Sequence, residues 1–146
     1  LAEVAMALPD LQRLMHRKIA AALIVAGEVV ATEARRSVQN SPRGGNTYEK
    51  YNPRRTHKAS AAGEAPATDL GFLVRSITTE VDESNLTVYV LSAHAIAPYA
   101  KVLEYGSMAG GIQPRPFLRP ALRKKEKEVT RIVRQAMRKA LAEYGR

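Results

Sequence analysis

A stretch of 31 residues in the first half of the chain, 39–69, contains no Leu, Ile, Val, Met or Phe. Such a segment cannot bury a core of its own, because folding is driven mainly by the burial of apolar surface. The flanking residues must therefore supply the core. We expect a single domain over residues 1–146, with an extended polar loop at 39–69. The length of 146 residues agrees, since single domains usually run to about 100–200 residues.

Before the loop, apolar residues recur at steps of three and four, which is the period of a helix that buries one stripe. They are Leu11, Leu14, Met15, Ile19, Leu23, Val29, Val30 and Val38. Asp10 follows Pro9 and is expected to cap the N-terminus of a helix that runs to Val38. Gly27 weakens this helix by about 1 kcal/mol relative to Ala.

After the loop the period changes to two. Apolar residues alternate with polar ones over 77–81 and again over 86–91, and four polar residues, 82–85, separate the runs. This pattern predicts a β-hairpin, which needs a helix to pack on. Pro98 can open a short helix that Gly106 ends.

A final apolar stripe predicts an amphipathic helix from about Pro116 to Tyr144, with a basic outer face. Between the short helix and this one, residues 107–116 form a second loop. The predicted fold class is therefore α+β. Long N-terminal and C-terminal helices pack on a small antiparallel sheet, and a long basic loop projects from it.

The formal net charge is +9, and most of it lies at the C-terminal end. Residues 115–146 carry 11 basic and 3 acidic side chains. Such a region attracts polyanions, so nucleic acid or an acidic protein surface is an expected neighbour. A solvated helix face that keeps the chain soluble explains the same charges.

The polar loop places basic side chains beside Tyr48 and Tyr51. Arginine and lysine neutralise phosphates, and tyrosine rings stack on bases or on protein aromatics. We therefore expect this loop to contact DNA or a protein partner, unless it is an unstructured tether. The candidate contact residues are Arg43, Lys50, Arg54, Arg55 and Lys58.

Signals for catalysis are sparse. The chain has no Cys, and its three histidines, His16, His57 and His94, are far apart in the sequence. No phosphate-binding loop, nucleophile elbow or dinucleotide fingerprint occurs. We expect no enzyme activity, no catalytic residues, no cofactor and no metal.

The sequence also indicates where in the cell or virus the chain is located. The longest apolar runs fall far short of the roughly 18–20 residues that a membrane span needs, so no membrane partner is expected. The first twenty residues lack the basic start and apolar stretch of a secretion signal. We expect a soluble location, inside the cell or in a virion.

Three segments resemble the tail-completion, or head-to-tail joining (neck), proteins of long-tailed bacteriophages. They are GEAPATDLG (63–71) leading to LVRSI (73–77), APY (97–99) with LEYG (103–106), and RPFLRPAL (115–122). With the flanking helices they cover nearly the whole chain, and the last segment is the most specific. The resemblance implies two helices packed on a small sheet, in copies that form a ring of six at the top of the tail.

The function implied is that of a structural subunit of a neck or tail-end ring, which completes the tail and joins it to the DNA-filled head. Its partners would be further copies of the chain, other phage neck and tail proteins, and genomic DNA in the lumen. Its location would be the virion, and the host cytoplasm during assembly. The predicted subunit interface comprises Tyr99, Leu103, Glu104, Tyr105, Arg115, Phe117, Leu118 and Arg119.

Two other classes of function are alternatives to a phage ring subunit. A stand-alone, non-specific nucleic-acid-binding protein would bind duplex DNA with an affinity that falls steeply with salt. A hydrolase or nuclease with scattered acids would show metal-dependent turnover, which nothing in the sequence predicts.

Overall fold

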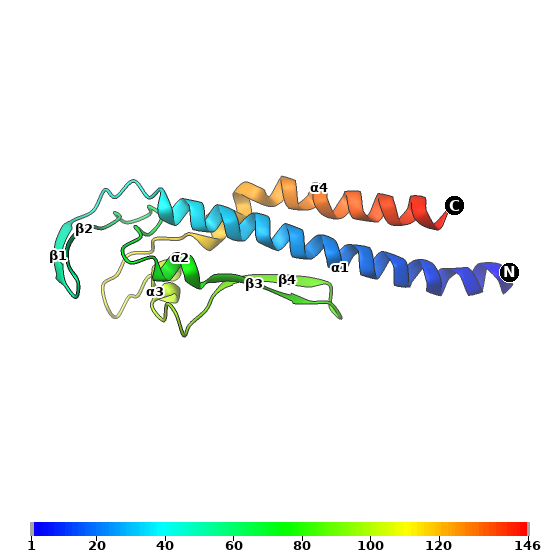
Figure 1. Cartoon of the computed structure of the whole chain (residues 1–146), viewed down its shortest axis with the longest axis horizontal. Helices are drawn as coiled ribbons and strands as arrows, with labels where there is room; N and C mark the ends of the chain where they lie inside the picture. The colour runs from blue at the N-terminus through cyan, green and yellow to red at the C-terminus, as the bar shows by residue number, and fades with distance from the viewer. Residues whose placement is uncertain (1, 146) are drawn as a thin grey trace.

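The computed structural model describes residues 2–145 and shows a mixed helix and sheet fold, which confirms the α+β class (Figure 1). The elements are α1 (Ala2–Gln39), β1 (Thr47–Tyr51), β2 (Arg54–Lys58), α2 (Phe72–Ser76), β3 (Ile77–Asp82), β4 (Thr87–Ser92), α3 (Ala100–Tyr105) and α4 (Leu118–Tyr144). The four strands form two separate antiparallel sheets, β1–β2 and β3–β4. The final helix and the β3–β4 hairpin follow the predicted boundaries to within two residues.

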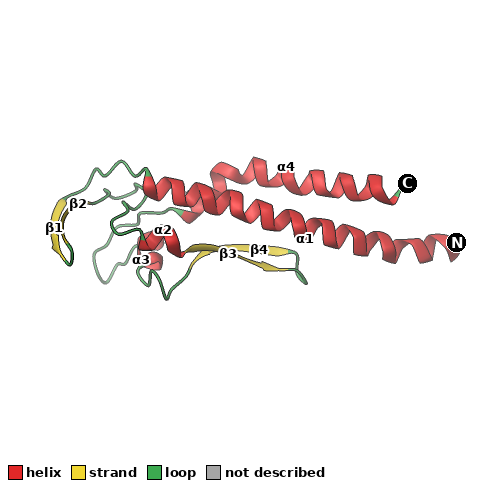
Figure 2. Ribbon diagram, viewed as in Figure 1, coloured by secondary structure: helices red, strands yellow, loops and turns green. Residues whose placement is uncertain are grey.

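The two long helices lie side by side and antiparallel (Figure 2). Near the C-terminal end of α4, Tyr144 donates a hydrogen bond to the carbonyl oxygen of Ala7 at 2.7 Å. Lys18 and Glu143 form an ion pair at 2.9 Å. Of the helices described, none is both long and apolar enough to cross a membrane.

Helix α1 lies between α4 and the β3–β4 hairpin, and the main core surrounds its C-terminal half (Figure 1). This core holds Val30, Ala31, Ala34, Val38, Leu73, Ile77, Ala97, Ala100, Phe117 and Ala121. Half of these side chains are alanine, so the elements approach closely and each buries little apolar surface. Phe117, only 1% exposed, is the largest of them.

The hairpin packs against α1 at a position where the helix has no side chain. A Cβ atom on Gly27 would lie 2.5 Å from Cγ2 of Val88 in β4. Any larger residue at position 27 would therefore push the hairpin away. Gly27, which lowers the intrinsic stability of the helix, is what permits this close approach.

The N-terminal boundary of the first helix was predicted wrongly. Helix α1 begins at Ala2 and continues through Pro9, so Asp10 does not cap it. A proline inside a helix costs one backbone hydrogen bond, but its fixed φ is compatible with helical geometry, and the helix continues here. Asp10 instead forms an ion pair with Arg13, one turn further along.

The polar segment 39–69 is also more ordered than predicted. It contains the β1–β2 hairpin, in which Thr47 pairs with Lys58 and Tyr51 with Arg54. Its short turn includes a cis peptide bond between Asn52 and Pro53. The hairpin lies beyond the ends of the long helices, away from the main core (Figure 1).

Candidate interaction surfaces

A buried carboxylate joins α3 to the start of α4. Glu104, only 3% exposed, accepts hydrogen bonds from the backbone N–H groups of Phe117 at 2.7 Å and of Leu118 and Arg119 at 3.0 Å. Helix N-termini leave such N–H groups without partners inside the helix, and they favour negative charge. Since Phe117 provides no side-chain cap of its own, Glu104 acts as the cap from a distant element.

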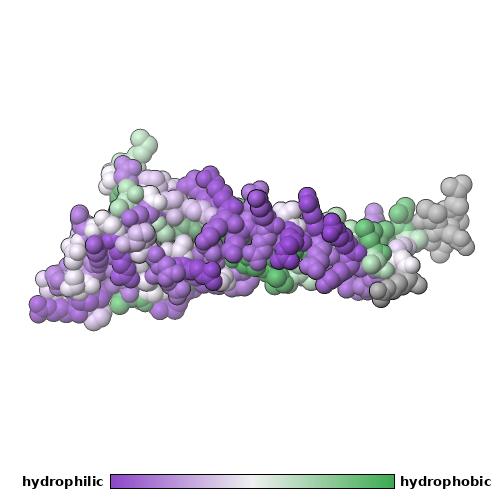
Figure 3. All heavy atoms as spheres, turned by 90° about the horizontal axis from the view of Figure 1, so that it is seen from above, coloured by the Kyte–Doolittle hydropathy of each residue, from purple (hydrophilic) through white to green (hydrophobic). Residues whose placement is uncertain are grey.

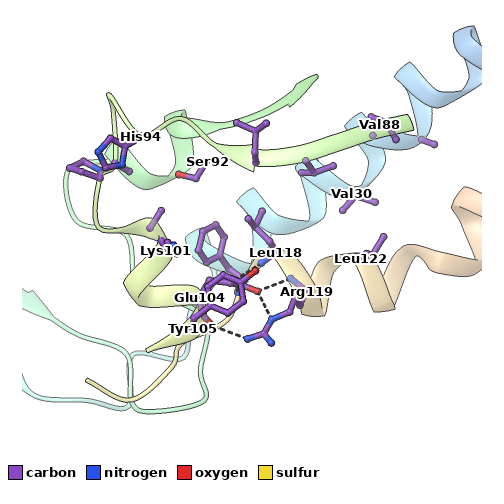
Figure 4. Close-up of a pocket in the computed structure, with 18 of the residues that line it drawn as sticks. Val30, Val88, Ser92, His94, Lys101, Glu104, Tyr105, Leu118, Arg119 and Leu122 are labelled. Atoms are coloured by element: carbon purple, nitrogen blue, oxygen red, sulfur yellow. Dashed lines mark hydrogen bonds and ion pairs between the residues drawn. The ribbon is translucent and has the colours of Figure 1, made fainter. Parts of the chain in front are cut away.

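Arg119 completes this junction. Its Nε donates to the Glu104 carboxylate at 3.0 Å, and its Nη2 donates to the Glu104 carbonyl oxygen at 2.9 Å (Figure 4). Burial alone raises the pKa of Glu104. The three backbone N–H groups and Arg119 together outweigh burial and hold the pKa below its usual value. The side chain is therefore an ionised acceptor at neutral pH.

The loop before α4 is fixed by backbone bonds. Gly106 ends α3 at φ 74°, in the region that favours glycine, and its N–H donates to Val102. The N–H of Arg115 then donates to the carbonyl oxygen of Leu103 at 2.6 Å, and Arg115 Nε donates to that of Ser60 at 3.1 Å. The proline-rich run 114–120 is thereby held against both α3 and the second half of the 39–69 segment.

The residues of the predicted subunit interface differ in how exposed they are. Phe117 and Glu104 are buried inside this chain, and Arg115 and Arg119 bond to other parts of it. Leu103 and Leu118 are partly buried, next to the main core. Only Tyr99 and Tyr105 present large exposed apolar surface, and the guanidinium of Arg119 lies over the Tyr105 ring at 4.7 Å.

Beside this junction lies an open, mainly apolar groove of about 470 Å³, which we call the α1–β4 groove (Figure 4). Its lining includes Ala26, Gly27 and Val30 of α1, Val88 and Val90 of β4, and Leu122 and Val129 of α4. Residues of α3, including Lys101, Glu104 and Tyr105, also line it. The groove was not predicted, because it forms where β4 and α4, which are distant in sequence, both pack on α1. Its only sequence signal was Gly27.

The carboxylate of Asp69 bonds to two basic side chains of the β1–β2 hairpin. Asp69 accepts two hydrogen bonds from Arg55, at 2.7 and 2.6 Å, and one from Lys50 at 2.7 Å. The hydrogen bond from Arg55, followed by that from Lys50, lowers the pKa of Asp69 well below its usual range against the effect of burial. Burial and the nearby cations Lys50, Arg43 and Arg55 lower the pKa of His57.

The five predicted contact residues of this segment therefore differ in availability. Lys50 and Arg55 are paired with Asp69, and Arg43 donates to the carbonyl oxygen of Thr68 at 3.4 Å. Arg54 and Lys58 lie on the opposite face of the hairpin, since alternate residues of a strand point to opposite sides. Both are exposed. Within residues 2–145 no three acidic or histidine side chains gather as metal ligands would.

Comparison with known proteins gives no family from which a function could be transferred. No family model, characterised protein or solved structure matches the chain. The resemblance to tail-completion proteins therefore stays a prediction. The three segments that carry it do lie together. Leu73, Ala100 and Phe117, one from or next to each segment, share the main core.

Proposed function

We propose that this chain is a structural subunit of a ring at the neck or tail end of a bacteriophage, where it completes the tail and joins it to the DNA-filled head. The observation that carries the proposal is the unequal division of apolar side chains between the interior and the surface. The resemblance of three segments to tail-completion proteins gives the proposed location in the virion.

Among the residues described, nine of the fourteen buried hydrophobic side chains are alanine, whereas seventeen large hydrophobic side chains are exposed. Scattered exposed hydrophobics are ordinary, but large apolar surfaces indicate contact with another molecule. A second copy of the chain is the occupant we propose, because further copies would cover surfaces that the small core of one copy leaves open.

Two surfaces with apolar side chains lie on different sides of the helical pair. One is the α1–β4 groove. The other is formed around Ile24 and Val25, which are both exposed and do not line that groove, and charged side chains such as Glu28 and Arg36 border it. A contact that joins two different surfaces repeats from copy to copy, and it closes into a ring when the rotation allows. This arrangement supports a ring rather than a twofold dimer.

Leu122 offers a direct test of the groove. It lines the groove and is 54% exposed, so a substitution there leaves the core of the chain in place. Leu141 lies on the same helix with the same exposed fraction, outside that lining. We expect Leu122→Glu to remain folded but to abolish rings in negative-stain images, and Leu141→Glu to retain them. Rings that persist in Leu122→Glu would contradict the proposed interface.

Charge reversal at Arg115 or Arg119 is a poorer test. Both side chains bond within this chain, so their reversal would disturb the α3–α4 junction as well as any interface. Tyr105 is a better second site, because its ring is exposed. Tyr105→Ser should weaken ring assembly while lowering thermal stability only slightly, because within the chain it removes one exposed contact with the Arg119 guanidinium.

The alternative function, a nucleic-acid-binding protein that acts alone, is favoured by the concentration of positive charge at the C-terminal end. It predicts a monomer that binds duplex DNA. Mass photometry separates the two proposals, because only the first requires assembly.

A further inference from the structure

The cations of α4 fall into two sets. Lys124 pairs with Glu33 at 2.5 Å, and Lys125 pairs with Glu128 at 3.2 Å. Arg119 pairs with Glu104 at 3.0 Å. Six others form no ion pair or side-chain hydrogen bond within the part of the chain that the structure describes, and all six are exposed. Lys139 lies on another face of the helix, and the remaining five share one face. We call these five the basic stripe: Arg123, Lys127, Arg131, Arg134 and Arg138.

The stripe follows one side of the helix. Its members are separated by four, four, three and four residues, so at about 100° per residue they share one face. The same arithmetic places them roughly opposite Ala121 and Ala140, the buried residues of α4. At about 1.5 Å per residue the stripe is about 22 Å long. The view from the α4 side shows hydrophilic side chains projecting there (Figure 3).

The surroundings of the stripe favour a phosphate backbone over a protein as the partner. The side chains between the cations, Glu126, Thr130 and Gln135, are polar. Protein interfaces normally contain an apolar or aromatic centre, whereas the exposed apolar side chains next to the stripe, Met137 and Leu141, lie only towards its C-terminal end. Phosphate contacts need no such centre, and four of the five cations are arginines, whose planar donors suit phosphate oxygens.

The paired cations of the hairpin make a useful contrast. Lys50 and Arg55 already hold Asp69, so a phosphate would have to compete with a carboxylate for them. Among the described residues, Glu126 lies beside the stripe, and Glu128, three residues before Arg131, already pairs with Lys125. The long, unpaired row is therefore on the helix rather than on the segment from which the sequence predicted DNA contact.

We propose that the basic stripe of α4 binds the phosphate backbone of duplex DNA without sequence preference. The inference rests on the proposed function for the presence of DNA, which would pass through the lumen of the ring. Binding itself does not require assembly. A row of five cations neutralises about five phosphates, so the logarithm of the affinity should fall with the logarithm of salt concentration with a slope of about −4.5.

The test compares two triple variants of equal net charge by fluorescence anisotropy with a labelled duplex at several salt concentrations. The first, Lys127→Gln with Arg131→Gln and Arg134→Gln, removes the centre of the stripe. The control, Arg13→Gln with Arg17→Gln and Lys139→Gln, removes three exposed helical cations that lie outside the stripe. Glutamine keeps helix propensity close to that of arginine and lysine, so both variants should fold.

We expect the stripe variant to lose about tenfold or more in affinity at moderate salt and the slope to flatten to about −2. The control variant should keep most of the affinity for DNA and most of the dependence on salt. Equal losses in the two variants would show that net charge alone matters and would overturn the assignment, as would the absence of DNA binding by the unmodified chain. Poly-glutamate that competes as well as unlabelled DNA would also overturn it and would indicate an acidic protein partner.

The same samples examined by mass photometry separate this inference from the proposed function. A monomer that binds DNA through the stripe would retain the inference and refute the ring. A ring that fails to bind DNA would refute the inference and retain the ring.

Discussion

Glu104 and Asp69 each hold a distant segment of this chain in place, but in different surroundings. Glu104 is 3% exposed and bonds mainly to backbone N–H groups at the start of α4. The Asp69 side chain is 21% exposed and bonds to the ends of two long side chains of the β1–β2 hairpin. The first carboxylate satisfies groups that have no other partner, whereas the second holds groups that water can solvate.

This difference indicates that Glu104 stabilises the fold as a whole, whereas Asp69 fixes the position of the β1–β2 hairpin. Removing a buried acceptor leaves several donors without partners, which costs far more than the loss of an exposed ion pair. The α3–α4 junction should therefore be essential for folding. The hairpin should be able to loosen while the rest of the chain stays folded.

The largest effect is expected from Glu104→Ala. The change leaves three backbone N–H groups and Arg119 without their acceptor, so the free energy of unfolding should fall by about 3 kcal/mol. Chemical denaturation measures this loss. Glu28→Ala is the control, because Glu28 also binds an arginine, Arg35, but its side chain is 53% exposed. If Glu104→Ala lowered the free energy of unfolding no more than Glu28→Ala does, the contrast between Glu104 and Asp69 would be contradicted.

The contact between α1 and β4 is expected to be closely packed, like the α3–α4 junction. Gly27→Val places side-chain atoms where Val88 already lies, so it should lower the free energy of unfolding by about 2 kcal/mol. Gly110→Ala is the control, since a Cβ there meets neighbours only at 3.4 Å or more. Equal stability of the two variants would show that the β3–β4 hairpin can shift freely on α1.

The pH dependence of stability tests the charge state of Glu104. Its pKa is lower in the folded chain, so its stabilising contribution is complete above the unfolded value of about 4.3 and is lost as the pH falls through the folded value. The stability difference between the unmodified chain and Glu104→Gln should therefore be constant near pH 7 and shrink at acid pH. A difference that stays constant down to pH 2 would contradict this assignment.

The smallest effect on overall stability is expected from Asp69→Asn. The ion pair between Asp69 and Arg55 is partly buried, but it joins only the hairpin to its neighbours, so the free energy of unfolding should fall by about 1 kcal/mol. Hydrogen exchange of the backbone amides of residues 47–58 should nevertheless become faster, because the hairpin loses its attachment. High salt should reproduce part of this effect in the unmodified chain. Arg54→Gln, on the other face of the hairpin, should leave the exchange rates unchanged.

Local patterns predicted the long helices, the β3–β4 hairpin and the short helix ended by Gly106, because each depends on spacing within a few residues. The β1–β2 hairpin was missed because its strands, TYEKY and RRTHK, lack alternating aliphatic residues. Its signals were the tyrosines and threonines and the Asn52-Pro53 turn.

The candidate site was harder to predict than the fold. The sequence drew attention to Glu104, Phe117 and Arg119 and predicted them in an interface between subunits, which stays a prediction. In the structure these residues bond or pack within one chain, across a loop of more than ten residues. Contacts of that kind depend on how the loop folds back, which no local pattern specifies. The basic face of α4 was predicted, but the ion pairs that Lys50 and Arg55 form with Asp69 were not.

The central claim is that one copy of the chain leaves apolar surface that further copies cover. Native mass spectrometry of the purified protein over a range of concentrations tests it directly. A closed ring predicts a single assembly at a multiple of the 16.0 kDa chain mass, near 96 kDa for six copies. Leu122→Glu should shift this assembly to the mass of one chain. A 16.0 kDa species alone, at every concentration of the unmodified protein, would contradict the claim.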